Sequence, residues 1–142
     1  MEECIENSSE PIAEQWIRHG HWAQREFVGD FRQADIIVCP TIAEEAHGPT
    51  AVEATAVDRL IVASLICGLM FTVLDEVTGL LFKPGDPVDL ASQLARLDDR
   101  VLRGRIGNAA RMHFQHHYTW DVIIVKQYRK LFGPTIREHL ER

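Results

Sequence analysis

The stretch Asp35–Ser64, DIIVCPTIAEEAHGPTAVEATAVDRLIVAS, contains two apolar runs separated by a polar segment with a glycine. The runs, Ile36–Cys39 and Leu60–Ser64, are short, uncharged and rich in β-branched residues, which is typical of strands buried on both faces of a sheet. Between them we expect a short helix over Thr50–Val57. The stretch therefore predicts a strand–loop–helix–strand unit with parallel strands.

The pattern continues toward the C-terminus. Gly79–Phe82 is predicted to form a third strand. Asp86-Pro87 predicts a helix start, with a capping carboxylate and a proline in the first turn. We expect an inward leucine stripe on that helix, a second helix over Arg100–Gln115 and a restart at Thr119, with three aromatics in the core. The stripe is Leu90, Leu94 and Leu97, and the aromatics are Trp120, Tyr128 and Phe132. The predicted fold class is α/β, a partial Rossmann-like parallel sheet with flanking helices.

Composition limits the function classes. The 142 residues provide one domain at most, and the net charge of −6 argues against sequence-independent nucleic-acid binding. Three scattered cysteines without a C-x-x-C pair favour a reducing, cytoplasmic setting. The nearly uncharged run Leu60–Leu74 is shorter than the roughly 20 residues of a membrane span. We expect a strand followed by a loop and turn there, and no transmembrane segment.

Residues 22–132 are expected to form the domain, with an uncertain segment over 1–21 and a charged tail over 133–142. Ligands of parallel α/β sheets bind at the carboxyl ends of the strands. The Pro40–Thr50 loop leaves one such end and carries Glu45, and seven residues separate Glu45 from Glu53. Helix-start N–H groups suit phosphate and carboxylates accept sugar hydroxyls, so the pair predicts a site for a polyhydroxylated, phosphorylated ligand.

From about Phe31 to Leu131 the chain resembles the C-terminal, donor-binding domain of family 4 retaining glycosyltransferases, which have the GT-B fold. The segments that carry the resemblance are Ala34–Thr41, the E-x7-E element Glu45–Glu53, Gly68-Leu69 with Val77–Leu81, Pro84–Pro87 and Tyr118–Asp121. Gly68–Val73 further resembles the sucrose-phosphate-synthase-like branch.

The resemblance implies a role for each matching position. Glu45 would be the catalytic residue and contact the donor sugar, Glu53 would bind the ribose, and backbone groups of the helix start would face the diphosphate. The backbone groups belong to His47, Gly48 and Thr50, while Gly68 and Leu69 would border the sugar pocket. The implied reaction moves a hexose from a nucleoside diphosphate sugar to an acceptor without a metal or cofactor.

The chain also departs from the family pattern. Asp58 and Cys67 occupy positions where the family usually has glycine, and Leu60 occupies one where it usually has proline. Pro49 has no N–H, so one potential donor to the phosphate is lost. The family's basic pair and its acceptor domain lie upstream of the matching segments. We therefore expect a donor-binding fragment that is inactive alone. We also expect it to self-associate or to need a partner, and to need the acceptor domain in cis or on a partner chain for activity.

Two alternatives from other classes remain. The chain could be a non-catalytic truncated module or a subunit completing a site with a partner chain, or another sugar-nucleotide enzyme such as an epimerase. A metal site is considered for three histidines that share a helix face, His113, His116 and His117. No cysteine or carboxylate lies near enough in the sequence to complete a set of ligands, so we expect no metal there.

Overall fold

The structure is a computed structural model that describes residue 29, residues 31–44 and residues 46–132. The segment 1–21, the tail 133–142 and Glu45 lie outside the described residues.

In the described part of the chain, three parallel strands form the sheet. They are β1 (Ile36–Cys39), β2 (Leu60–Ser64) and β3 (Leu80–Phe82), in the spatial order β1-β2-β3. Ile37 pairs with Ile61, and Ala63 pairs with Leu81. The predicted strands and the α/β class are confirmed, because each uncharged run became a strand shielded on both faces.

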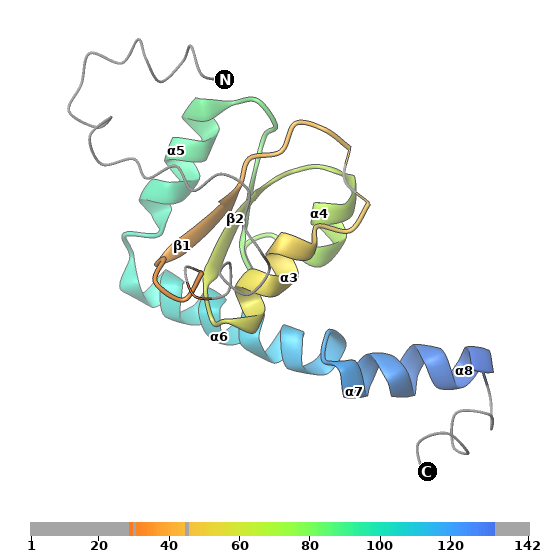
Figure 1. The fold of residues 1–142 in the computed structure, drawn as a ribbon. Coiled ribbons are helices and arrows are strands. Elements are labelled where there is room, and N and C mark those ends of the chain that lie inside the picture. The colour runs from red at the N-terminus through yellow and green to blue at the C-terminus, as the bar shows by residue number, and fades with distance from the viewer. Residues whose placement is uncertain (1–28, 30, 45, 133–142) are drawn as a thin grey trace.

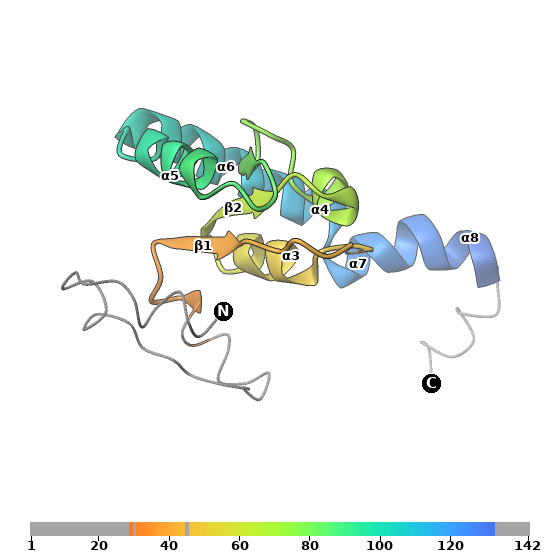
Figure 2. The same cartoon turned by 90° about the horizontal axis from the view of Figure 1, so that it is seen from above.

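Helices cover both faces of this sheet (Figures 1 and 2). After β1 comes α3 (Pro49–Ala56), after β2 comes α4 (Cys67–Thr72), and after β3 come α5 (Pro87–Arg96) and α6 (Arg100–His117). The chain ends its described part with α7 (Trp120–Ile123), a π-helical turn η2 (Ile124–Tyr128) and α8 (Arg129–Phe132). Both views show α7 and α8 extending beyond the sheet.

Alternate residues of each strand point to opposite faces, which produces two cores. Ile37, Ile61 and Leu81 pack with Ala51 and Ala54 of α3 and with Leu69 of α4. On the other face the core consists of Val62, Leu80, Phe82, Leu97 and Ile106, with Leu90 and Leu94 packed against it. The leucine stripe predicted for α5 is therefore confirmed.

The start of α5 is fixed by carboxylates. The Asp86 side chain accepts hydrogen bonds from the N–H groups of Val88 and Asp89, both at 3.1 Å, as its capping role predicts. Asp89 in turn accepts from the Lys83 N–H at 2.7 Å and from Gln93 at 3.3 Å. α5 thus begins at a fixed position after β3.

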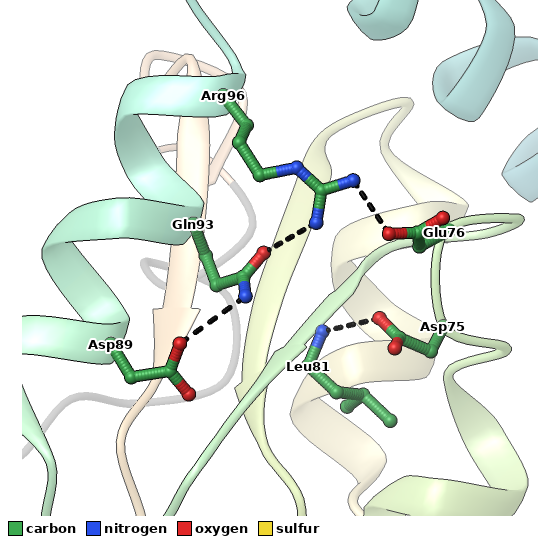
Figure 3. A network of polar contacts seen from close by, with 6 residues as sticks. All are labelled: Asp75, Glu76, Leu81, Asp89, Gln93 and Arg96. Carbon is green, nitrogen blue, oxygen red and sulfur yellow. Dashed lines mark hydrogen bonds and ion pairs between the residues drawn. The ribbon is translucent and has the colours of Figure 1, made fainter.

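A polar network joins α5 to the turn before β3 (Figure 3). Arg96 donates to Gln93 at 2.9 Å and forms an ion pair with Glu76 at 2.6 Å. Asp75 accepts a 2.9 Å hydrogen bond from the Leu81 N–H. The network fixes the 75–79 turn, so β3 enters the sheet in a set register.

Two expectations were wrong. The segment after β2 contains the helix α4 rather than only a loop and turn, because Leu69 and Val73 are buried under the sheet at helical spacing. Trp120, Tyr128 and Phe132 are not in the core, since they are 72%, 43% and 56% exposed. α7 and α8 run past the edge of the sheet, so no described element covers these three aromatic side chains.

In the described part of the chain, no helix is both long and apolar enough to cross a membrane.

Candidate functional site

The three strands are parallel, so their carboxyl ends share one edge of the sheet. The connection 40–48 leaves β1 there, residues 65–66 leave β2, and residues 83–86 leave β3. The first connection leads into α3, the second into α4 and the third into α5, so all three helices begin at this edge (Figure 1). This is where the fold favours ligand binding.

Gly48 forms the turn into α3. Its backbone is left-handed, with φ 64° and ψ 59°, and no side chain caps the helix. Of the first N–H groups, Pro49 has none and that of Ala51 bonds the Gly48 carbonyl at 3.0 Å. Among the described residues, the N–H groups of Gly48 and Thr50 have no hydrogen-bond partner, so they are the donors of an uncapped helix start, an arrangement that suits an anion.

α4 supports this turn from behind. A Cβ added to Gly68 would stand 2.3 Å from the Ala46 carbonyl carbon and 2.4 Å from the His47 nitrogen. The buried Leu69 side chain lies against Gly48, and the Thr72 hydroxyl donates to the His47 carbonyl at 2.5 Å. The residues 46–48 are thus packed directly on the first turns of α4.

Glu53 lies further along α3 and lines a pocket of about 560 Å³. The half-buried Glu53 carboxylate and the exposed His47 imidazole border a largely apolar wall. That wall consists of Pro49, Val52, Ala56, Phe114, Tyr118, Trp120 and Ile123, with Thr119 beside it. The His47 and Tyr118 ring centroids are 6.2 Å apart. The pocket offers one carboxylate acceptor, with aromatic side chains in its lining.

The structure brings most of the predicted site residues together. His47 and Gly48 contact Gly68 and Leu69 across the turn, and Thr50 and Glu53 follow on α3. Glu45 lies outside the described residues, directly before this turn. Gly68 and Leu69 are buried and pack against the turn, and their predicted place at the border of the sugar pocket stays a prediction.

Sequence reasoning missed Thr72 and Tyr118. Thr72 also contacts the carbonyl of Gly68, four residues before it, at 3.1 Å, and this i−4 contact is the usual one for a threonine within a helix. Nothing in the sequence pointed to its second partner, His47. Tyr118 stood in a segment that we interpreted only as a helix start.

Histidines and Tyr118 form a cluster next to the pocket. The rings of His113 and His117 stack at 4.4 Å, and Tyr118 meets His113 edge-on at 5.6 Å. Burial lowers the pKa of His113, and the nearby His117 lowers that pKa further. Among the described residues, no three His, Cys, Asp or Glu side chains form a group that could hold a metal ion.

The loop 40–50, which carries the Gly48 turn, contains no lysine or arginine. Arg59 and Lys83 are the basic residues between Arg32 and Arg96 in the sequence. Arg59 precedes β2, at the opposite edge of the sheet, where it donates to the Arg32 carbonyl at 2.6 Å. Lys83 follows β3, at the far side of the sheet from β1.

The backbone conformation at Asp58 explains why an aspartate can replace the glycine that is usual at this position. Asp58 adopts φ 61°, the left-handed region that glycine enters most readily and that aspartate tolerates. Its carboxylate pairs with Arg111 of α6 at 2.9 Å.

The sequence is similar to several curated proteins. A D-inositol 3-phosphate glycosyltransferase from Arthrobacter sp. is 40% identical over 118 residues, which cover 80% of this chain and 28% of that protein. The protein of the same name from Salinispora tropica is 34% identical over 113 residues, covering 79% of this chain and 23% of the relative. The chain therefore spans about a quarter of the length of these relatives.

Solved structures agree with the fold. A sucrose-phosphate synthase from Thermosynechococcus elongatus superposes with a TM-score of 0.70 and 32% identity, over 80% of this chain and 29% of that one. The Anabaena protein HepE, solved with UDP-glucose, gives a TM-score of 0.62 at 24% identity over 78% of this chain and 28% of its own, which is a likeness of fold. The family of group 1 glycosyl transferases matches residues 2–99. The chain belongs to the group 1 glycosyl transferases.

Proposed function

We propose that this chain binds the nucleotide-sugar donor of a retaining glycosyltransferase, which moves a hexose from a nucleoside diphosphate to an acceptor. The observation that carries the proposal is the uncapped start of α3 at Gly48, which stands at the carboxyl edge of the sheet and one turn before Glu53. The diphosphate would meet the N–H groups of Gly48 and Thr50. Glu53 would accept hydroxyls of the ribose.

Glu45 is the proposed catalytic residue, in contact with hydroxyls of the donor sugar. Its position directly before the 46–48 turn supports this role, since the turn would carry the diphosphate next to it. The leaving group is a nucleoside diphosphate, so the reaction depends on stabilising its departing charge. We propose that the protein's own groups do this without a metal ion.

Transfer also needs an acceptor hydroxyl held at the anomeric carbon. We propose that an acceptor-binding part, in cis or on a partner chain, supplies it together with cations for the diphosphate. The lack of lysine and arginine in the loop 40–50 supports the need for further cations. Two surfaces suit such a partner: the apolar face of α7–α8 and the edge of β1, which among the described strands pairs only with β2.

The first experiment measures donor binding. UDP-glucose and GDP-glucose are titrated into the chain while the amide NMR signals of Gly48 and Thr50 are followed. We expect dissociation constants in the millimolar range, because the loop 40–50 contains no lysine or arginine to offset the charge of the diphosphate. Glu53→Gln should weaken binding roughly tenfold, since hydrogen bonds to a charged acceptor contribute about 1.5 kcal/mol or more.

Glu44→Gln is the matched control, because it removes the same charge from an exposed residue of the preceding loop. It should leave the dissociation constant within about twofold, as expected for a screened surface charge. Signals that move only outside residues 46–56, or none at high millimolar donor, would contradict the proposed site.

The second experiment measures transfer with a radiolabelled donor. We expect no product from the chain alone, and product when the acceptor-binding domain of a relative is added. D-inositol 3-phosphate is the first acceptor to test, because it appears in the names of the similar glycosyltransferases. Reproducible transfer by the chain alone would overturn the proposed dependence on a second part. Loss of that transfer in Glu45→Ala would still support the role of Glu45.

A further inference from the structure

We propose that Thr72 is a positioning residue that sets the direction of the Gly48 N–H at the proposed phosphate site. The inference rests on the proposed function, because that function gives the Gly48 N–H its ligand. Thr72 is in α4, and its hydroxyl donates to the carbonyl of His47 in the turn, 25 residues earlier in the sequence.

The geometry gives the hydroxyl one main partner. Thr72 is 6% exposed, and its oxygen lies 2.5 Å from the His47 carbonyl and 3.1 Å from the Gly68 carbonyl. A hydroxyl has one proton to donate, and both neighbours are acceptors. The shorter distance assigns that proton to the His47 carbonyl.

The His47 carbonyl and the Gly48 N–H belong to the same peptide unit. No described peptide bond is cis, and in a planar trans peptide the C=O and N–H point in opposite directions. A hydrogen bond that holds the His47 oxygen toward α4 therefore turns the Gly48 N–H away from α4. That is the direction in which an anion at the start of α3 could accept it.

The backbone at Gly48 does not fix this direction by itself. Glycine occupies positive and negative φ about equally, so rotation of the 47–48 peptide costs less here than at another residue. Gly68 and Leu69 limit how closely the turn approaches α4, but their contacts are apolar or steric. Among the described contacts of the 46–48 turn, the Thr72 hydroxyl is the polar one from α4.

The test compares three variants of the full chain. Thr72→Val keeps the shape and removes the hydroxyl, while Thr72→Ser keeps the hydroxyl. Thr78→Val is the matched control, because Thr78 is equally buried, at 3% exposure, and its hydroxyl accepts from the Leu74 N–H at 2.8 Å in a different loop. If Thr72→Val does not fold, Thr72→Cys replaces it as a similar-sized residue with a weak donor.

Two readouts separate this inference from the proposed function. The first is the residual dipolar coupling of the Gly48 N–H in the free protein, which reports its direction without donor. It should change in Thr72→Val and stay as in wild type in Thr72→Ser and Thr78→Val. The second is the dissociation constant for UDP-glucose, which should rise roughly threefold to tenfold in Thr72→Val alone, the range expected for one hydrogen bond.

An unchanged Gly48 coupling in Thr72→Val would overturn the inference, and so would an equal loss of affinity in Thr78→Val. If the wild type binds no nucleotide sugar, the proposed function fails, and the Gly48 coupling alone decides the role of Thr72.

Discussion

Leu69 lies directly against Gly48: a Cβ placed on Gly48 would stand 2.4 Å from the Leu69 Cδ2 atom. Gly48 also has a positive φ of 64°. Gly48 is therefore restricted twice, by its backbone conformation and by the side chain beneath it.

Gly48→Ala should lower the free energy of unfolding by about 2 to 4 kcal/mol, the sum of left-handed strain and overpacking. Gly85→Ala is the control, because Gly85 has φ 72° but no atom within 4 Å of an added Cβ. It should cost only about 1 to 2 kcal/mol. Urea unfolding measures both, and equal losses would show that Leu69 moves aside freely.

Asp58 provides a second backbone test. Asp58→Asn and Asp58→Gly should each change the free energy of unfolding by no more than about 0.5 kcal/mol, because both residues tolerate positive φ and the exposed pair with Arg111 contributes little. Asp58→Val should cost about 2 kcal/mol, since a β-branched residue is strained there. A loss in Asp58→Asn as large as in Asp58→Val would instead make the ion pair the stabilising feature.

The sequence predicted the parts of the fold that depend on local pattern. The uncharged runs at Ile36–Cys39 and Leu60–Ser64 became parallel strands, and Asp86-Pro87 began a helix. α4 was missed because it has six residues and no side-chain cap, so little local signal marks it. α4 packs on the 46–48 turn and on the sheet, and both partners are remote from it in the sequence. A local sequence pattern does not report such contacts.

The candidate site was predictable only in outline. The E-x7-E spacing located the turn and α3, but the partner of the turn was not in the pattern. Thr72 reaches His47 across a sequence separation of 25 residues, and no periodicity encodes such a contact. Trp120 shows the opposite error, since helical spacing predicts an apolar face but not what covers it.

The His113 cluster predicts a dependence of stability on pH. Burial and His117 hold the pKa of His113 below the value of about 6.5 expected in the unfolded chain. As pH falls through 6.5, the unfolded state takes up a proton at this residue before the folded state does, so folding is weakened below that pH. Above it both states are neutral at His113 and the effect vanishes.

His113→Gln should therefore reduce the loss of unfolding free energy between pH 7.5 and pH 5.5, measured by urea titration. His117→Gln should reduce it less, because His117 is the smaller of the two causes and burial remains. The same pH dependence in His113→Gln and wild type would show that other groups produce it.

The apolar surface of α7, η2 and α8 predicts self-association. Trp120, Val125, Tyr128, Leu131 and Phe132 are between 43% and 77% exposed on these elements, which extend beyond the sheet (Figure 2). Large apolar side chains that are exposed together on one helical segment tend to be covered by another protein surface. We therefore expect the sedimentation coefficient of the chain to rise with concentration, and Leu131→Lys to weaken the association. Val101→Lys is the control, because Val101 is equally exposed, at 79%, but lies at the start of α6 and changes the charge identically. A compact monomer at every concentration would contradict the prediction, and an association unaffected by Leu131→Lys would leave the edge of β1, rather than α8, as the contact.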